Sequence, residues 1–155
     1  MQKKLVIRGL LCLLILGAWL FPAHAGDSIF GKIVEVKSAD IVVLDYGKGQ
    51  YTVRIIGIVP PKSGQLAQQS KDFVAGLVLG KHVRLRFEGR NQDGTMEGQL
   101  QTAENNDDIR DVGLEVVRAG LARKQTDYDY KYGELSAAER EARSAKRGLW
   151  SSERQ

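Results

Sequence analysis

The chain has little of what disulfide scaffolds and transition-metal centres need. Of its 155 residues, one is cysteine and two are histidine. The cysteine, Cys12, lies in an apolar N-terminal run, so no disulfide can stabilise the rest of the chain and an ordinary hydrophobic core must do so. His82 has no cysteine and no second histidine near it in the sequence, which argues against a transition-metal site.

The chain also has no apolar run long enough to cross a bilayer. The run from residue 10 to residue 21 has 12 residues, whereas a spanning helix needs about 20. Basic residues precede it, and Ala23-His24-Ala25 follows it as a small-x-small signal-peptidase site. We therefore expect residues 1–25 to be a signal peptide and residues 26–155 to be a single exported domain, periplasmic or secreted, without membrane attachment after cleavage. The alternative is an uncleaved N-terminal anchor.

The basic character of the precursor comes mostly from this N-terminal segment. The whole chain has 23 basic and 19 acidic residues. Three of the basic residues, Lys3, Lys4 and Arg8, lie in the expected signal peptide, which contains no acidic residue. The remaining chain has a net charge of +1, so overall charge gives no support for a nucleic-acid partner.

Residue patterns predict five strands and three helices. Strands are indicated by segments that are rich in β-branched residues or alternate in polarity, and that are bounded by turns containing glycine or proline. These segments are 29–36, 41–45, 51–58, 82–88 and 97–103. Apolar residues at helical spacing indicate helices at 66–79, 108–121 and 132–147. This order predicts an α+β, mainly β fold, in which a five-stranded OB-type barrel carries three helices.

Three separated stretches resemble the staphylococcal (thermo)nuclease family. The stretch 36–42 is similar to the family's Val-x-Asp-Gly-Asp-Thr-Val, and Arg54 to Pro61 is similar to its strand arginine followed by Asp-Thr-Pro-Glu. The third stretch is the C-terminal half, with matches at 114–122, 128–132, 138–142 and 148–151. The resemblance implies an OB-fold and a calcium-dependent phosphodiesterase acting on DNA and RNA. Such a site uses two calcium-binding aspartates, a glutamate near the water and two phosphate-contacting arginines.

The residues of that site match poorly. Asp40 fits one calcium-ligand aspartate, and Arg54 fits the first arginine. Val59 stands where the resemblance places the second aspartate, and valine cannot ligate calcium. Lys62 stands in place of the glutamate, and a protonated amine cannot accept a proton from water. The second arginine should follow a glycine on the fifth strand, and neither candidate there supplies it: Gly94-Thr95 and Gly98-Gln99.

We therefore expect an impaired nuclease that acts as a binding module. Its ligand should contact one barrel face, and the partner is either a protein or an anionic chain such as single-stranded nucleic acid. The near-neutral charge favours a protein, and no cofactor is expected. The face is lined by Asp40, Arg54, Lys62, Arg84 and Tyr128.

The alternative is an active calcium-dependent nuclease with a rearranged site. It would need other carboxylates near the same mouth, for which Asp45, Glu88, Asp93 and Glu97 are the candidates.

Each candidate residue can also be explained by a purely structural role. Asp40 can be a turn residue that accepts hydrogen bonds, and Arg54 can be paired to a nearby carboxylate. Lys62 is either an exposed loop lysine or part of an anion site. Tyr128, with Tyr130 and Tyr132, either stacks on a nucleotide base or covers the barrel and packs the third helix, and we favour the covering role. Trp150 should anchor the C-terminal segment.

Overall fold

The computed structural model describes residues 28–102, 109–130 and 132–151. The expected signal peptide and its cleavage site lie outside the described residues. Among the described residues, no helix is long and apolar enough to cross a membrane.

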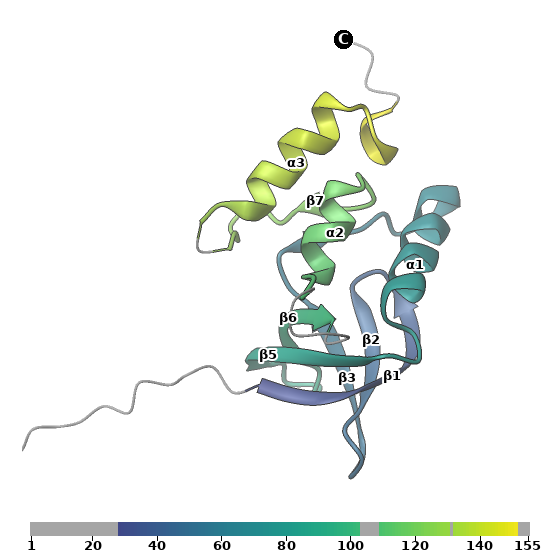
Figure 1. Cartoon of the computed structure of the whole chain (residues 1–155), viewed down its shortest axis with the longest axis vertical. Helices are drawn as coiled ribbons and strands as arrows, with labels where there is room; N and C mark the ends of the chain where they lie inside the picture. The colour runs from purple at the N-terminus through teal and green to yellow at the C-terminus, as the bar shows by residue number, and fades with distance from the viewer. Residues whose placement is uncertain (1–27, 103–108, 131, 152–155) are drawn as a thin grey trace, which may run out of the picture.

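Five strands close into a barrel in the order β1-β2-β3-β6-β5 (Figure 1). All neighbours pair antiparallel except β3 and β6, which run parallel and complete the closure. This confirms the predicted five-stranded barrel. The strands are β1 (Ser28–Ser38), β2 (Ile41–Asp45), β3 (Gln50–Ile55), β5 (His82–Arg90) and β6 (Met96–Thr102).

The core fills the barrel and the space between it and the helices. Fully buried aliphatic side chains come from every barrel strand, and strand alternation places polar side chains on the outer surface. The core side chains of the barrel include Ile33, Val42, Leu44, Val53, Ile55, Val83, Leu85 and Leu100.

The described helices gather over one end and side of the barrel (Figure 1). They are α1 (Gly64–Val78), α2 (Val112–Arg118), α3 (Glu134–Ser144) and the short 3-10 helix η1 (Gly148–Trp150).

The prediction that the second helix starts at residue 108 is wrong. The helix starts at Val112 because the Asp111 side chain caps it, accepting a hydrogen bond from the Leu114 amide at 3.0 Å.

The predicted third strand is interrupted by a turn. It was expected to run over residues 51–58, but β3 ends at Ile55 and a separate strand, β4 (Ile58–Val59), follows. Gly57 lies between them with φ +80°, a left-handed conformation that suits glycine. The chain therefore turns, and β4 pairs with β7 (Arg123–Lys124), a strand that the sequence patterns did not indicate.

The C-terminal segment is held to the domain as expected for Trp150. Its side chain is 2% exposed and is covered by the guanidinium groups of Arg123 and Arg143, at 4.7 and 4.0 Å from the ring centroid.

Tyr128 and Tyr130 pack against the core. Tyr132 does not, since it lies in the turn before Gly133 and is 79% exposed. The covering role predicted for the three tyrosines is therefore wrong for Tyr132.

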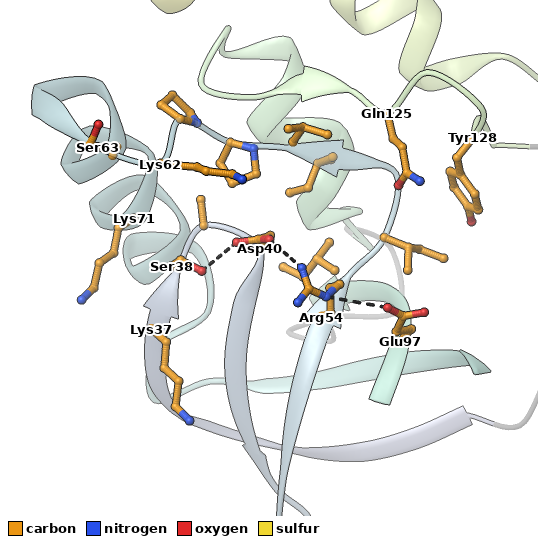
Figure 2. Close-up of a pocket in the computed structure, with 18 of the residues that line it drawn as sticks. Lys37, Ser38, Asp40, Arg54, Lys62, Ser63, Lys71, Glu97, Gln125 and Tyr128 are labelled. Carbon is orange, nitrogen blue, oxygen red and sulfur yellow. Dashed lines mark hydrogen bonds and ion pairs between the residues drawn. The ribbon is translucent and has the colours of Figure 1, made fainter. Parts of the chain in front are cut away.

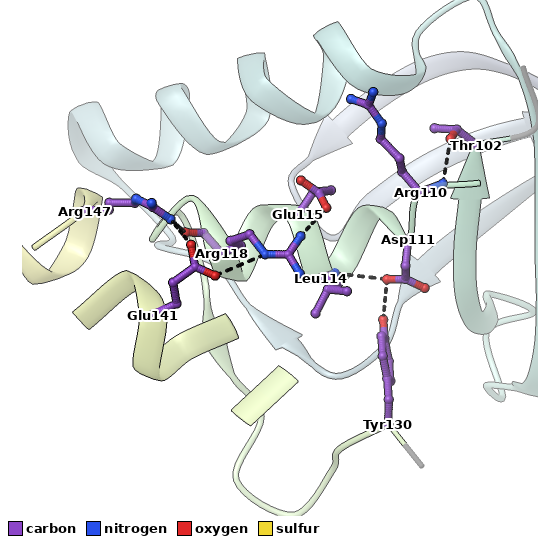
Figure 3. A network of polar contacts seen from close by, with 9 residues as sticks. All are labelled: Thr102, Arg110, Asp111, Leu114, Glu115, Arg118, Tyr130, Glu141 and Arg147. Carbon is purple, nitrogen blue, oxygen red and sulfur yellow. Dashed lines mark hydrogen bonds and ion pairs between the residues drawn. The ribbon is translucent and has the colours of Figure 1, made fainter. Parts of the chain in front are cut away.

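A polar network joins α2 to α3 and to residues 128–130, which we call the tyrosine segment (Figure 3). Arg118 pairs with Glu141 at 3.4 Å, and Arg147 pairs with the same glutamate at 2.8 Å. The Tyr130 hydroxyl donates to Asp111 Oδ1 at 2.7 Å, while Asp111 Oδ2 is buried without a hydrogen-bond partner. Burial raises the pKa of Asp111, although Tyr130, the Leu114 and Gly113 amides and the Arg86 charge each lower it in part.

The raised pKa predicts how the stability conferred by Asp111 changes with pH. A carboxyl group with a raised folded-state pKa stabilises the fold at low pH, and this stabilisation is lost as pH rises through that pKa. The free energy of unfolding of the wild type should therefore fall relative to that of Asp111→Asn as pH rises from about 4, the usual aspartate pKa. Urea unfolding of both proteins across this range measures the difference. A pH-independent difference would contradict the burial of a titrating carboxyl group.

Candidate functional site

A pocket of about 1180 Å³ opens at one end of the barrel (Figure 2). Its walls are the turn between β1 and β2, the end of β3, strand β4, the Pro60-Pro61 turn, the start of α1, and parts of β5, β6 and the tyrosine segment. The turn at Gly57 positions two of these walls. A β-carbon at Gly57 would lie 2.7 Å from Tyr128 and from Leu135, so the close approach requires glycine.

Arg54 lies between two carboxylates inside this pocket. Asp40, in the turn after β1, accepts a hydrogen bond from Ser38 Oγ at 2.7 Å and one from Arg54 Nη1 at 3.3 Å. Arg54 Nε lies 3.7 Å from Glu97 Oε1, because Arg54 and Glu97 face each other across the parallel β3–β6 pair. Two carboxylates thus surround one guanidinium, and Arg54 has the carboxylate partner that its structural role predicted (Figure 2).

The described part of the chain does not supply a calcium site of the expected kind. No group of three or more histidine, cysteine, aspartate or glutamate side chains is placed to hold a metal ion within it. Of the reserve carboxylates, Glu88 and Glu97 line the pocket, whereas Asp45 and Asp93 are not among its lining residues. Glu88 accepts the Tyr128 hydroxyl at 3.0 Å and Glu97 faces Arg54. A Ca²⁺ ion needs six to eight oxygen ligands, so these residues do not fit it.

Val59 and Lys62 take the places that the resemblance gives to carboxylates, and both line the pocket. Val59 is 45% exposed at the end of β4. The Lys62 side chain extends across the pocket in the direction of Asp40 (Figure 2). An ammonium group therefore lies over the wall where the nuclease site would need negative charge to hold a dication.

Two further lysines line the same pocket and were not singled out from the sequence. Lys37 comes from the end of β1 and Lys71 from α1. Neither they nor Lys62 form an ion pair within 4.0 Å with any carboxylate of the described residues. We call Lys37, Lys62 and Lys71 the lysine wall, and it leaves positive charge without a counter-charge on the α1 side of the pocket.

Tyr128 forms the opposite wall and is held by its neighbours. Its hydroxyl donates to Glu88 and accepts from Gln99 Nε2 at 3.4 Å. Burial, with the negative charge of Glu88 adding to it, raises the pKa of Tyr128 to about 12. Its ring lies edge-on to Tyr130, with centroids 6.1 Å apart. Tyr128 therefore presents a neutral, fixed aromatic wall.

The structure brings together most, but not all, of the residues expected at one face. Asp40, Arg54, Lys62 and Tyr128 line the pocket, whereas Arg84 does not. Arg84 lies on the outer side of β5, where its Nε donates to Gln101 Oε1 at 3.1 Å. Arg84 lies four residues before the pocket residue Glu88 in β5, about 13 Å along the strand at about 3.3 Å per residue, and this distance separates it from the pocket.

Comparison with known proteins agrees with the barrel fold. The model of the family described as staphylococcal nuclease homologue matches residues 52–152. A protein of Escherichia coli O157:H7 described as an uncharacterized endonuclease is 31% identical over 139 residues, covering 89% of this chain and 87% of that protein. A protein of Escherichia coli with the same description is 30% identical over 139 residues, with the same coverage.

Fold and site together define a nuclease-type OB barrel with a polar pocket at its end. The chain belongs to the staphylococcal nuclease homologue family.

Proposed function

We propose that the protein is an exported, catalytically impaired member of this nuclease family, and that its pocket binds an anionic chain, with single-stranded nucleic acid as the leading ligand. The observation that carries the proposal is the position of Arg54 between Asp40 and Glu97. The retained arginine and the retained aspartate neutralise each other in this arrangement. The two carboxylates therefore weaken the attraction of Arg54 for a phosphate, and Arg54 weakens the attraction of Asp40 for a metal ion.

The chemistry of phosphodiester cleavage supports impairment. Cleavage needs a hard cation held by carboxylates, a group that orients or deprotonates water, and positive charge on the phosphorane. Val59 removes a ligand, Lys62 removes the base, and Glu97 puts negative charge beside the arginine. Loss of single electrostatic contacts of this kind costs about 10²–10³-fold in rate, so three losses together reduce the rate by several orders of magnitude.

The lysine wall supports binding of an anion. Three lysines line one side of the pocket and have no carboxylate partner within 4.0 Å among the described residues. Lysine binds phosphate well as a point charge and needs no metal ion to do so. The relatives described as endonucleases make a nucleic acid the first ligand to test. Local charge thus favours an anionic chain over the protein partner that the near-neutral overall charge favours.

The test is binding and cleavage of labelled single-stranded DNA and RNA by the chain without residues 1–25, with calcium or with EDTA. We expect salt-sensitive binding that EDTA does not change, and no calcium-dependent cleavage. Lys62→Glu with Lys71→Glu should weaken binding by about tenfold or more, because two attractive contacts become repulsive. Arg140→Glu, an exposed reversal on α3, is the matched control and should have a small effect.

The second candidate is an active endonuclease, which the description of the relatives favours. It predicts calcium- or magnesium-dependent degradation that Asp40→Asn and Arg54→Ala abolish. Metal-dependent turnover at low protein concentration would overturn impairment. Failure of all nucleic acids to bind, with capture of a specific protein, would instead favour a protein partner.

A further inference from the structure

We propose that unpaired nucleotides also bind outside the pocket, on the outer side of strands β1, β5 and β6. This inference rests on the proposed function, because it extends the same nucleic-acid strand beyond the pocket. We call this surface the outer strand face. It is formed by Phe30, Lys32, Arg84, Arg86, Gln99 and Gln101.

Phe30 is the first observation that needs an explanation. Along β1, Gly31 and Ile33 are buried, whereas Phe30 and Lys32 between them are exposed. Phe30 is 62% exposed near the start of β1, where the strand is paired with β5, and none of the described helices covers this side of the barrel (Figure 1). A large aromatic ring held in the open on a rigid strand is a surface on which another planar group can stack.

The charges around Phe30 are the second observation. Phe30 pairs with Arg84, and Ser28 in the same strand pairs with Arg86. On the other side of β5, these arginines pair with Gln101 and Gln99. Directly opposite residues have β-carbons about 5 Å apart and diagonal ones about 7–8 Å, so Arg84 and Arg86 rise from the same sheet face as Phe30, with their guanidinium groups bonded toward β6.

The two arginines are oriented without being neutralised. Arg84 and Arg86 donate to the side-chain oxygens of Gln101 and Gln99, which are neutral acceptors. Neither arginine, nor Lys32, has a carboxylate within 4.0 Å among the described residues, and Asp111 near Arg86 is buried. By contrast, four arginines elsewhere in the described chain each pair with a carboxylate: Arg54, Arg118, Arg143 and Arg147.

An exposed ring beside uncompensated cations fits a single-stranded nucleic acid. Bases can stack on Phe30 only when they are unpaired, while Lys32, Arg84 and Arg86 can contact the phosphates. A duplex offers the phosphates but not the faces of its bases. The outer strand face is also continuous with the pocket, since Arg86 contacts Gln99, and Gln99 contacts the pocket residue Tyr128.

Oligonucleotide length separates the two surfaces experimentally. Protein purified after expression of the full chain is titrated with oligothymidylates of about 3 and about 12 nucleotides. Phe30→Ala should weaken binding of the longer oligonucleotide by about tenfold, as expected for one lost stacked base, and Arg84→Gln with Arg86→Gln should do the same. The shorter oligonucleotide, which the pocket alone can hold, should bind these variants as it binds the wild type. Lys62→Glu with Lys71→Glu should weaken the binding of both oligonucleotides.

Matched controls and a direct signal complete the test. Leu79→Ala removes a side chain of comparable exposure, 49%, at the end of α1, and Arg140→Gln removes an exposed arginine on α3. Both should bind like the wild type. In Phe30→Trp, the fluorescence of the new indole should be quenched by the longer oligonucleotide but not by a duplex.

Each contrary result has a separate meaning. Unchanged binding of the longer oligonucleotide to the Phe30 and arginine variants, or no quenching in Phe30→Trp, would overturn this inference and leave the pocket proposal standing. Equal losses for both oligonucleotides, or tighter binding to anionic lipid vesicles than to the longer oligonucleotide, would also overturn it. If Lys62→Glu with Lys71→Glu bound both oligonucleotides as the wild type does, the pocket proposal would be overturned. The Phe30 and arginine variants would still test the outer strand face.

Discussion

Replacement of Gly98 by alanine should prevent stable closure of the barrel. Gly98 lies in β6 between Ile55 of β3 and Phe87 of β5, at the point where the parallel pair completes the closed sheet. A β-carbon at this position would lie 2.1 Å from the Arg86 carbonyl oxygen and 2.9 Å from its carbonyl carbon. Backbone atoms of a paired strand cannot move aside without breaking that pairing, so the clash cannot be relieved by a side-chain rotation.

The expected loss is large compared with the stability of a domain. We expect Gly98→Ala to lower the free energy of unfolding by about 4 kcal/mol or more, the range of severe steric and packing changes. Domains are commonly stable by about 5–15 kcal/mol, so much of the variant should be unfolded or insoluble at 37 °C. Urea unfolding followed by far-UV circular dichroism measures the change.

Gly89→Ala provides the matched control for this prediction. Gly89 lies in the adjacent strand β5, opposite Glu97, and a β-carbon there would meet nothing within 4 Å. Alanine at position 89 should therefore change stability by less than about 1 kcal/mol. Equal stability of the two variants would contradict the close contact between β5 and β6 at Gly98.

The barrel was predictable because its strands are encoded locally. Segments such as 41–45 combine β-branched residues with clear turn residues on either side, and β2 has the predicted bounds. The closure of the barrel was not encoded in this way. The β3–β6 pairing is parallel and joins residues more than forty positions apart, and the β4–β7 pair is only two residues long on each side. Such long-range contacts leave no periodic signal in either strand.

The site was predictable in part for the same reason. Asp40, Arg54 and Lys62 lie near strand ends, and the fold resemblance brings those ends to one pocket, as the structure does. The pairing of Arg54 with Glu97 depends on the parallel register, and the contribution of Lys71 depends on how α1 lies against the barrel. Arg84 was expected at this pocket because it is a strand arginine of a half-buried segment. Alternation gives its outward direction, but the position of the pocket near Glu88, four residues further along β5, follows only from the closed barrel.

The charge pattern of the pocket leads to a second large expected effect. Val59→Asp combined with Lys62→Glu should create calcium binding that we do not expect of the wild type. The two new carboxylates would join Asp40, Glu88 and Glu97 in lining the pocket, and one ammonium group would be removed. We expect a dissociation constant on the order of 10⁻⁴ M, at the strong end of the range for weak extracellular calcium sites. At a calcium concentration of about 100 times that value, the double variant should gain about 2.7 kcal/mol of stability.

Thermal unfolding with calcium or EDTA measures this gain, and the neutral pair Val59→Asn with Lys62→Gln is the control of matched size. Adding Asp40→Asn to the double variant should remove the calcium effect. A calcium-dependent stabilisation of the wild type would show that other groups already form a metal site, and would contradict the interpretation that the pocket residues do not fit calcium.

Cleavage should remain slow even when calcium binds, because Glu97 still lies 3.7 Å from Arg54 and holds its charge away from a phosphate. Only the further change Glu97→Gln, which frees Arg54 on one side, should then raise calcium-dependent cleavage, since the metal and the phosphate-binding charge act on the same transition state.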